Sequence, residues 1–308
     1  MTKIATREAY GEALAELGEE MKDIVVLDAD LSGSTKTAVF GKRFPDRFFN
    51  MGIAEQDLMC TAAGFATCGK IPFASTFAIF ATGRAFEQVR NSICYPELNV
   101  KVAATHAGLT VGEDGATHQA IEDLAIMRAL PNMTVINPAD AVEAKKAVRA
   151  AALHKGPVYL RFGRLAVETI FDESYEFEIG KGKVLKEGSD VAIIATGIMV
   201  SEALKAAKLL EDDGINAMVI NIHTLKPIDE DIILKAAECD AIVTAEEHSI
   251  IGGLGSAVAE VLAEKKPTPM RRIGVKDKFG QSGKPGELLE LYNLTAKDIV
   301  KAAQELKK

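Results

Sequence analysis

The segment from Thr105 to Gln119 (THAGLTVGEDGATHQ) gathers residue types that can move protons. It holds His106, His118 and Asp114, in a chain that has five histidines in all. Because histidine titrates near neutral pH, the pair could donate protons to a substrate or hydrogen-bond to its hydroxyl groups. The alternative is an ordinary exposed Gly-Glu-Asp-Gly turn with incidental histidines. The spacing matches no recognised metal site, so we predict no metal ligands on this chain.

A second candidate is Glu55, which lies among apolar and small residues in the segment Asn50–Leu58 (NMGIAEQDL). A carboxylate there could be a solvated residue at the start of a helix, where the helix dipole favours negative charge. It could also be a buried acid that shares a proton with a ligand. The residues alone leave both interpretations open.

Two aromatic residues, Phe77 and Phe80, are three positions apart in the segment Pro72–Phe80 (PFASTFAIF). Such a pair most often packs into the core from one face of a helix. It could instead form an aromatic wall against a planar ring of a ligand.

Three arginines, Arg7, Arg161 and Arg164, are candidates for holding a phosphate group. A guanidinium group presents a planar set of donors that matches phosphate oxygens in pairs. Single arginines are usually surface charge. The assignment therefore depends on where the fold places them.

The elements that must position these residues alternate between short β-branched runs and helical stretches in both halves of the chain. We predict a helix that starts at Thr6 as N-cap, and another that Asp140 and Glu143 begin. The predicted strands are IVVLDAD (from Ile24), KVAATHAG (from Lys101), TVINPAD (from Thr134), PVYLRFG (from Pro157), VAIIATG (from Val191), INAMVINI (from Ile215), AIVTAEE (from Ala241) and MRRIGV (from Met270).

This alternation predicts an α/β fold of two domains, each with a mainly parallel sheet flanked by helices. The first domain covers residues 1–165, an acidic and irregular linker covers 166–187, and the second domain covers 188–308. Ligands of open parallel sheets bind beyond the carboxyl ends of the strands. The candidate residues follow predicted strands, as that rule requires.

Composition sets limits on partners and location. Hydrophobic residues make up 48% and charged residues 26% of the chain, which is typical of a globular protein. The net charge of −8 argues against nucleic acid or a membrane surface as the main partner. No apolar run approaches the roughly 20 residues of a spanning helix. The cysteines (Cys60, Cys68, Cys94 and Cys239) show no disulfide or metal spacing, so we expect buried free thiols in a reducing cytoplasm.

Taken in this order, the segments resemble the C-terminal two-thirds of transketolases. Within the candidate segments, GIAEQDL (from Gly52), STF-x-x-F (from Ser75) and GEDGATHQ (from Gly112) are similar to family motifs. The similarity continues through HTLKPID (from His223), EEHSIIGGLG (from Glu246) and SGKPGELLELYNL (from Ser282), so it covers nearly the whole chain. The set of motifs is specific, although each motif alone is weak.

The resemblance implies thiamine diphosphate as cofactor. Glu55 would hydrogen-bond to N1′ of the aminopyrimidine, which favours the tautomer whose 4′ nitrogen removes the C2 proton. Phe77 and Phe80 would form the platform for the pyrimidine, and Asp30 would lie near the cofactor at a dimer interface. With His106 and His118, Glu55 is the implied catalytic set.

The resemblance also implies the substrate site. Arg7, Ser34 and Arg164 match the residues that bind the phosphate end of the sugar. The residues that contact donor or acceptor hydroxyls are His106, Asp114 and His118.

The sequence departs from the family pattern at two places. Gly83 followed by Arg84 stands where many members carry a tyrosine after the second aromatic, so the pyrimidine wall is expected to be partly rebuilt. Ala116 replaces the usual proline of the Gly-Glu-Asp-Gly signature, and we expect this change to be harmless.

Transketolases hold the cofactor diphosphate through Mg²⁺ (or Ca²⁺), which a Gly-Asp-Gly motif and a later Asn bind, and the sequence has no such motif. The resemblance therefore implies a split enzyme whose second, N-terminal chain binds the diphosphate and the metal ion. Because family sites form across a twofold interface, we expect two copies of each chain. The expected reaction transfers a two-carbon ketol unit from a ketose phosphate to an aldose phosphate.

Three alternatives remain at this stage. The β subunit of a 2-oxo acid dehydrogenase would share Glu55 but not the Gly-Glu-Asp-Gly signature after His106. A deoxyxylulose-phosphate synthase would normally have Asp in place of His106. A non-catalytic structural or regulatory subunit would be expected to have lost Glu55 or the histidines, and this chain keeps them.

Overall fold

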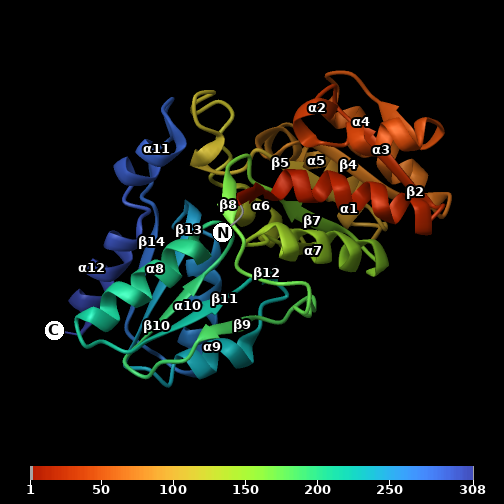
Figure 1. Cartoon of the computed structure of the whole chain (residues 1–308). Coiled ribbons are helices and arrows are strands. Elements are labelled where there is room, and N and C mark those ends of the chain that lie inside the picture. Colours follow the sequence, from red (N-terminus) through yellow and green to blue (C-terminus); the bar gives the residue numbers. More distant parts are fainter. Residues whose placement is uncertain (1–2, 308) are drawn as a thin grey trace.

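The computed structural model describes residues 3–307, which form two α/β domains side by side (Figure 1). Seven strands build the sheet of the first domain: β2 Ile24–Asp28, β3 Phe48–Asn50, β4 Ile71–Phe77, β5 Lys101–Thr105, β6 Thr134–Ile136, β7 Val158–Arg161 and β12 Thr224–Lys226. Their order is β12-β6-β7-β5-β4-β2-β3. All neighbours are parallel except β12, which comes from the second half of the chain and is antiparallel to β6.

The sheet of the second domain has the order β14-β13-β10-β11-β9. Its strands are β9 Lys183–Lys186, β10 Val191–Ala195, β11 Ala217–Asn221, β13 Ala241–Ser249 and β14 Met270–Val275. Only β9, at the edge, is antiparallel to its neighbour. The fold class and the eight strands expected from the sequence are confirmed.

The segment predicted as a linker, residues 166–187, is more ordered than the sequence suggested. It contains β8, Ala166–Glu168, which pairs antiparallel with β1, Lys3–Ala5. It also contains β9, so the second sheet begins before residue 188. Both strands are short and lie in polar sequence, which is why periodicity did not reveal them.

Helices cover both faces of the first sheet because its strands are apolar on both sides. In β2, Ile24 and Val26 lie in the core cluster with residues of α1 and α7, whereas Val25 and Leu27 lie in the cluster with residues of α4. This alternation follows from the two-residue period of a strand. The helices of this domain are α1 Thr6–Glu20, α2 Ser32–Thr35, α3 Ala38–Arg43, α4 Glu55–Thr67, α5 Phe86–Gln88, α6 Asp123–Ala129 and α7 Ala141–Leu153.

The second domain repeats this arrangement. Val191 and Ile193 of β10 share a core cluster with residues of α8 and α12, while Ala192 and Ile194 belong to the other cluster. The helices are α8 Met199–Asp212, α9 Glu230–Ala236, α10 Leu254–Lys265, α11 Pro285–Leu291 and α12 Ala296–Leu306.

One of the two predicted helix starts needs correction. Asp140 is the N-cap of α7, and its carboxylate accepts a hydrogen bond from Glu143 N at 2.8 Å, as expected. Thr6, however, is the first residue of α1, and Ala5 is its N-cap. The Thr6 hydroxyl instead accepts from Gly163 N at 2.8 Å, which ties the start of α1 to the segment after β7.

A buried arginine, Arg161, pairs with Asp123 in the first domain and also contacts the second domain. Arg161 Nε donates to Asp123 Oδ2 at 2.7 Å, and Arg161 Nη2 donates to Glu247 O at 3.1 Å from the second domain. Burial opposes the charge of Arg161, yet the adjacent Asp123 raises the pKa of the guanidinium overall. With β12 inserted in the first sheet, this contact couples the orientation of the two domains.

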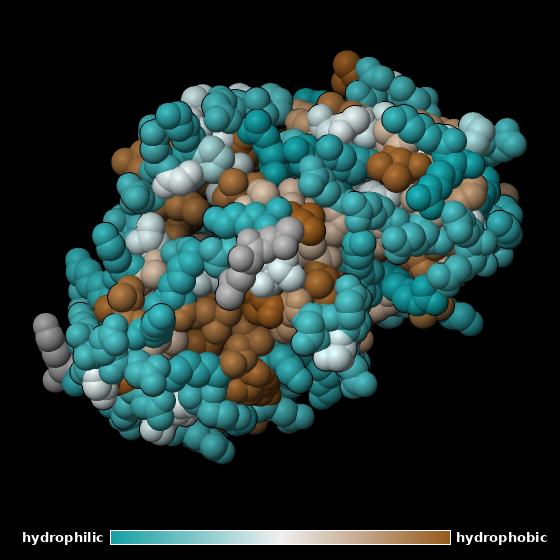
Figure 2. Space-filling view, viewed as in Figure 1, coloured by the Kyte–Doolittle hydropathy of each residue, from teal (hydrophilic) through white to brown (hydrophobic). Residues whose placement is uncertain are grey.

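The surface and the cysteines can be compared with the expectations from composition. The face in Figure 2 is hydrophilic over most of its area, with smaller apolar areas over the second domain. No helix within residues 3–307 is long and apolar enough to cross a membrane. All four cysteines are free, but only Cys94 and Cys239 are buried, so the expectation of four buried thiols is wrong for Cys60 and Cys68.

Candidate functional site

The candidate residues meet at the carboxyl edge of the first sheet. Asp30 follows β2, Phe77 ends β4, His106 follows β5, and Arg164 follows β7. Because these four strands are parallel, their ends lie at the same edge. The topology therefore brings together residues that are far apart in the sequence.

Glu55 lies at the start of a helix and is also buried. It is the first residue of α4, where the helix dipole favours its charge, but its side chain is only 3% exposed. Its Oε1 accepts a hydrogen bond from Arg84 Nη1 at 2.8 Å. A solvated helix-start residue is thus excluded, and Glu55 is a buried acid with one charged partner.

The two phenylalanines form a stacked pair beside this acid. Phe77 is at the end of β4, and Phe80 begins a short π-helix, Phe80–Arg84, so the pair does not share one helix face. The ring centroids are 5.9 Å apart with an interplanar angle of 14°. The guanidinium carbon of Arg84 lies 4.4 Å from the Phe80 centroid. An aromatic wall next to the buried carboxylate is the arrangement that a flat, hydrogen-bonding ring requires.

His106 is buried and neutral. Its ring stacks on Phe77 with centroids 3.9 Å apart. Burial, followed by the charges of Arg7 and Arg164, lowers the pKa of His106 to about 3. Because Arg7 Nη1 donates to Nε2 at 3.2 Å, Nε2 is the acceptor, and Nδ1 carries the hydrogen that goes to Thr105 Oγ1 at 2.9 Å. His106 can therefore accept or relay a hydrogen bond, but it is not an acid at neutral pH.

His118 and Asp114 lie on the loop that follows β5. His118 is half-buried, with its ring edge-on to Phe80 at 5.4 Å and its Nδ1 2.9 Å from Thr117 Oγ1. Asp114 is exposed in the turn Gly112–Gly115. The loop lies beside α11 of the second domain (Figure 1). The turn is thus exposed, as the simpler interpretation held, but it is held next to the aromatic pair.

Arg7 and Ser34, both predicted to bind the phosphate end of a sugar, are adjacent in the structure. Arg7 Nη1 donates to the backbone oxygen of Ser34 at 2.9 Å. Arg7 Nε is buried with no partner among the described residues, so it leaves a donor available. Burial lowers the pKa of Arg7, and Arg164 adds to this effect.

Asp28, which the sequence reasoning did not single out, shapes the turn that carries Ser34. Its carboxylate is buried and accepts from Leu31 N at 2.6 Å, Thr35 Oγ1 at 2.6 Å and Thr37 Oγ1 at 2.8 Å. Burial raises the pKa of Asp28, and these hydrogen bonds oppose that shift. The sequence signal for this role is the presence of two hydroxyl donors, Thr35 and Thr37, shortly after Asp28.

Arg164 and Arg161 have different roles, although both were phosphate candidates. Arg164 is 37% exposed and lies 2.9 Å from Glu113 Oε2, and it also donates to Val111 O. Arg161 is 4% exposed and fully engaged with Asp123, so the proposal that it grips phosphate is wrong. The two arginines are three positions apart, and Arg161 is buried whereas Arg164 is partly exposed.

Asp30 is exposed at the rim of the site. Its backbone has a φ of 61°, a left-handed conformation that Asp tolerates better than most residues. Its Oδ1 accepts from Asn50 Nδ2 at 2.9 Å. This pair joins the loop after β2 to the loop that leads into Glu55.

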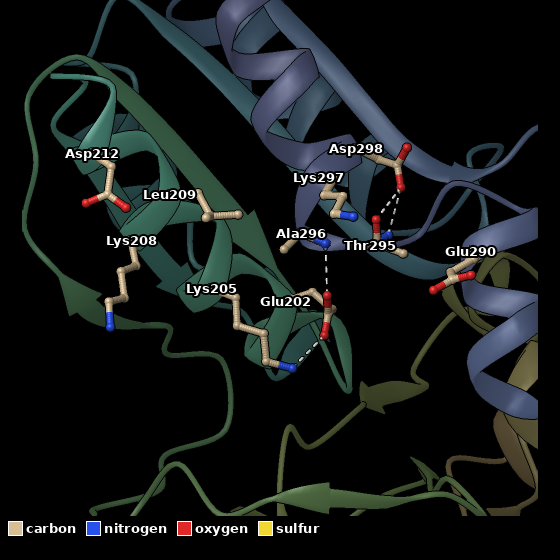
Figure 3. Close-up of a pocket in the computed structure, with 10 residues that line it drawn as sticks. All are labelled: Glu202, Lys205, Lys208, Leu209, Asp212, Glu290, Thr295, Ala296, Lys297 and Asp298. Atoms are coloured by element: carbon tan, nitrogen blue, oxygen red, sulfur yellow. Dashed lines mark hydrogen bonds and ion pairs between the residues drawn. The ribbon is translucent and has the colours of Figure 1, made fainter.

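Other features lie outside this site. A cleft of about 740 Å³ is lined by residues of α8 and α12 and by Glu290 of α11. In this cleft Glu202 pairs with Lys205 and accepts a hydrogen bond from Ala296 N (Figure 3). Asp298 and Thr295 form a capping box there, so these polar groups fix the start of α12. Within residues 3–307, no group of three or more His, Cys, Asp or Glu side chains could hold a metal ion.

Two family models match the chain. Residues 2–169 match the transketolase pyrimidine-binding domain, and residues 180–299 match the transketolase C-terminal domain. Together they cover nearly all of the elements described above.

Individual relatives agree with these matches. A putative transketolase C-terminal section of Methanocaldococcus jannaschii is 56% identical over 302 residues, which is 97% of this chain and 95% of that protein. Human transketolase is 39% identical over 309 residues, which is 99% of this chain but 49% of the human protein. A solved structure described as split gene transketolase, inactive beta4 tetramer, superposes with a TM-score of 0.93 at 62% identity, covering 99% of this chain and 98% of that one.

Proposed function

The chain belongs to the transketolase family, and we propose that it is the pyrimidine-binding and C-terminal subunit of a split transketolase. One observation carries the proposal: the chain spans nearly the full length of a C-terminal section and of a split-gene chain, but half of human transketolase. The missing half in that comparison would come from a second, diphosphate-binding chain that also holds the metal ion. We expect two copies of each chain in the active assembly.

The family depends on thiamine diphosphate, and the residues of this site fit its aminopyrimidine. Glu55 is buried and pairs with the planar guanidinium group of Arg84. Phe77 and Phe80 form a stacked aromatic wall nearby. A planar heterocycle with a ring nitrogen would satisfy the same acid and the same wall. When bound, the cofactor supplies an electron sink that allows the bond next to a ketose carbonyl to break.

In this assignment the residues of this chain bind, orient and manage protons. Glu55 would hold the proton at N1′ of the pyrimidine. His106 stays neutral because its pKa is about 3, so it would hydrogen-bond to substrate without protonating it. His118 and Asp114 would contact substrate hydroxyls from the loop after β5, and Asp30 would lie at the rim of the cofactor site.

The cations at the other side of the site favour a phosphorylated sugar. Arg7 and Arg164 influence each other electrostatically, and both act on His106. Glu113 already pairs with Arg164, and an anion bound between the two arginines would further reduce their mutual repulsion. With Ser34, they would hold the phosphate end of the sugar while its carbonyl faces the cofactor.

A donor assay separates this function from that of a 2-oxo acid dehydrogenase β subunit. The chain and its partner, with thiamine diphosphate and Mg²⁺, should transfer a two-carbon unit from xylulose 5-phosphate to ribose 5-phosphate. Decarboxylation of pyruvate with acylation of a lipoyl domain, in place of this transfer, would overturn the proposal.

A further inference from the structure

Arg84 lies where the two contacts of the pyrimidine site meet. Its Nη1 is 2.8 Å from Glu55 Oε1, and its guanidinium carbon is 4.4 Å from the Phe80 ring centroid. The side chain of Arg84 is 50% exposed, whereas that of Glu55 is 3% exposed. The acid is therefore fixed inside the protein, and the arginine is the partner that solvent can reach.

These two contacts are the same ones that an aminopyrimidine would need. A guanidinium group is planar, donates hydrogen bonds and rests on aromatic faces, so it satisfies the acid and the ring at once. In this structure the guanidinium of Arg84 occupies Glu55 Oε1. A proton shared between the acid and a ring nitrogen requires that this cation be withdrawn.

From this overlap, we propose that Arg84 occupies the place of the aminopyrimidine until the cofactor binds and then leaves Glu55. Arg84 would thus be a positioning residue, which keeps a buried acid paired and oriented in the chain without cofactor. This inference rests on the proposed function.

The local backbone allows the exchange. Arg84 ends the π-helix Phe80–Arg84, and π-helical turns are rare and concentrate at functional sites. Gln56 Nε2 donates to the backbone oxygen of Arg84 at 3.3 Å and anchors the main chain. Around Gly83 the nearest side-chain atom to an added Cβ is Ile79 Cδ1 at 4.0 Å, so the turn is open to solvent on this side. The side chain can rotate away while the main chain stays in place.

Replacing Arg84 by Met removes the charge and keeps an apolar stem over Phe80. In the cofactor-free complex Glu55 then lacks its partner, so this state is destabilised and cofactor binding recovers the loss. If the lost contact is a charge-assisted hydrogen bond at the weaker end of its range, the reconstituted R84M complex should bind thiamine diphosphate roughly tenfold more tightly than the unsubstituted complex. The melting temperature of R84M should fall without cofactor and match the unsubstituted complex with saturating cofactor.

Arg149→Met is the matched control, because Arg149 forms an exposed ion pair with Glu20 at 2.8 Å on a distant part of the same domain. It should leave cofactor affinity unchanged. Unchanged or weaker binding by R84M would overturn the inference, as would a melting deficit that persists with saturating cofactor. A structure of the loaded complex in which Arg84 still contacts Glu55 would do the same. If the unsubstituted complex binds no thiamine diphosphate, the proposed function itself fails.

Discussion

Replacing Arg164 by Ala separates a substrate clamp from a structural ion pair. Arg164 is 37% exposed and pairs with Glu113, which is 60% exposed, at 2.9 Å. It lies close enough to contribute, after burial, to the lowered pKa values of His106 and Arg7. Arg164 therefore lies in the same part of the site as His106 and Arg7.

The expected magnitude follows from two opposing contributions. A hydrogen bond to a charged group contributes about 1.5–3 kcal/mol, which corresponds to a factor of roughly ten to a hundred and fifty in binding. The exposed pair with Glu113 is worth up to about 1 kcal/mol and is given up when Arg164 turns to a phosphate. The difference of about 0.5–2 kcal/mol leads us to expect that R164A raises KM for xylulose 5-phosphate by roughly two- to thirtyfold.

The assay compares two donors on the reconstituted complex. Hydroxypyruvate has no phosphate, so its half-reaction should be nearly unaffected by R164A. Glu113→Gln is the matched control variant, because it removes the competing partner and keeps Arg164, and it should lower KM for the phosphorylated donor slightly. Equal damage to both donors by R164A would refute the clamp and assign Arg164 to the fold.

Three further predictions concern the acid, the domain junction and acid stability. Glu55→Gln should slow hydrogen–deuterium exchange at C2 of bound thiamine diphosphate by about 10²–10⁴, and unchanged exchange would leave Glu55 a structural acid. Arg161→Met leaves Asp123 buried without its cation, so urea unfolding should show a loss of about 3–5 kcal/mol, and a loss below roughly 1 would contradict this. Burial lowers the pKa of His223 from 6.5 to about 3. Between these values the unfolded chain binds a proton at His223 and the folded chain does not, so the free energy of unfolding falls as the pH drops below 6.5. Between pH 7 and pH 5 this effect lowers the free energy of unfolding by about 2 kcal/mol, and His223→Gln should abolish that loss. An equal loss in the substituted and unsubstituted proteins would exclude His223 as the cause.

Hydrophobic patterning was sufficient for eight of the twelve strands that the structure describes in the two large sheets. Every position of runs such as IVVLD and VAIIA is buried because helices cover both faces, and their consecutive apolar residues are visible without tertiary information. The strand β4 was less visible because Ser75 and Thr76 interrupt its apolar run. β12 could not be foreseen, since three residues of the second half pair with β6 across the domain boundary.

The candidate site was predictable where residue type and strand ends coincide, as for His106 and Arg164. The roles of the other candidates depend on which side chains are buried, and the sequence does not show this. Arg161 and Arg164 look equivalent in the sequence, and only the direction in which each side chain points assigns one to Asp123 and the other to the open edge. Arg84 was visible as a departure from the family pattern, but its contact with Glu55 spans 29 positions and depends on how a π-helix meets α4.

The most direct test of the account mixes this chain with its diphosphate-binding partner. The chain alone, with thiamine diphosphate and Mg²⁺, should give no ketol transfer from xylulose 5-phosphate to ribose 5-phosphate. Titrating in the partner should restore transfer and saturate at one partner per chain, in an assembly with two copies of each. Full activity of the chain alone, or a saturated mixture that remains inactive while binding the cofactor, would contradict the split-transketolase account.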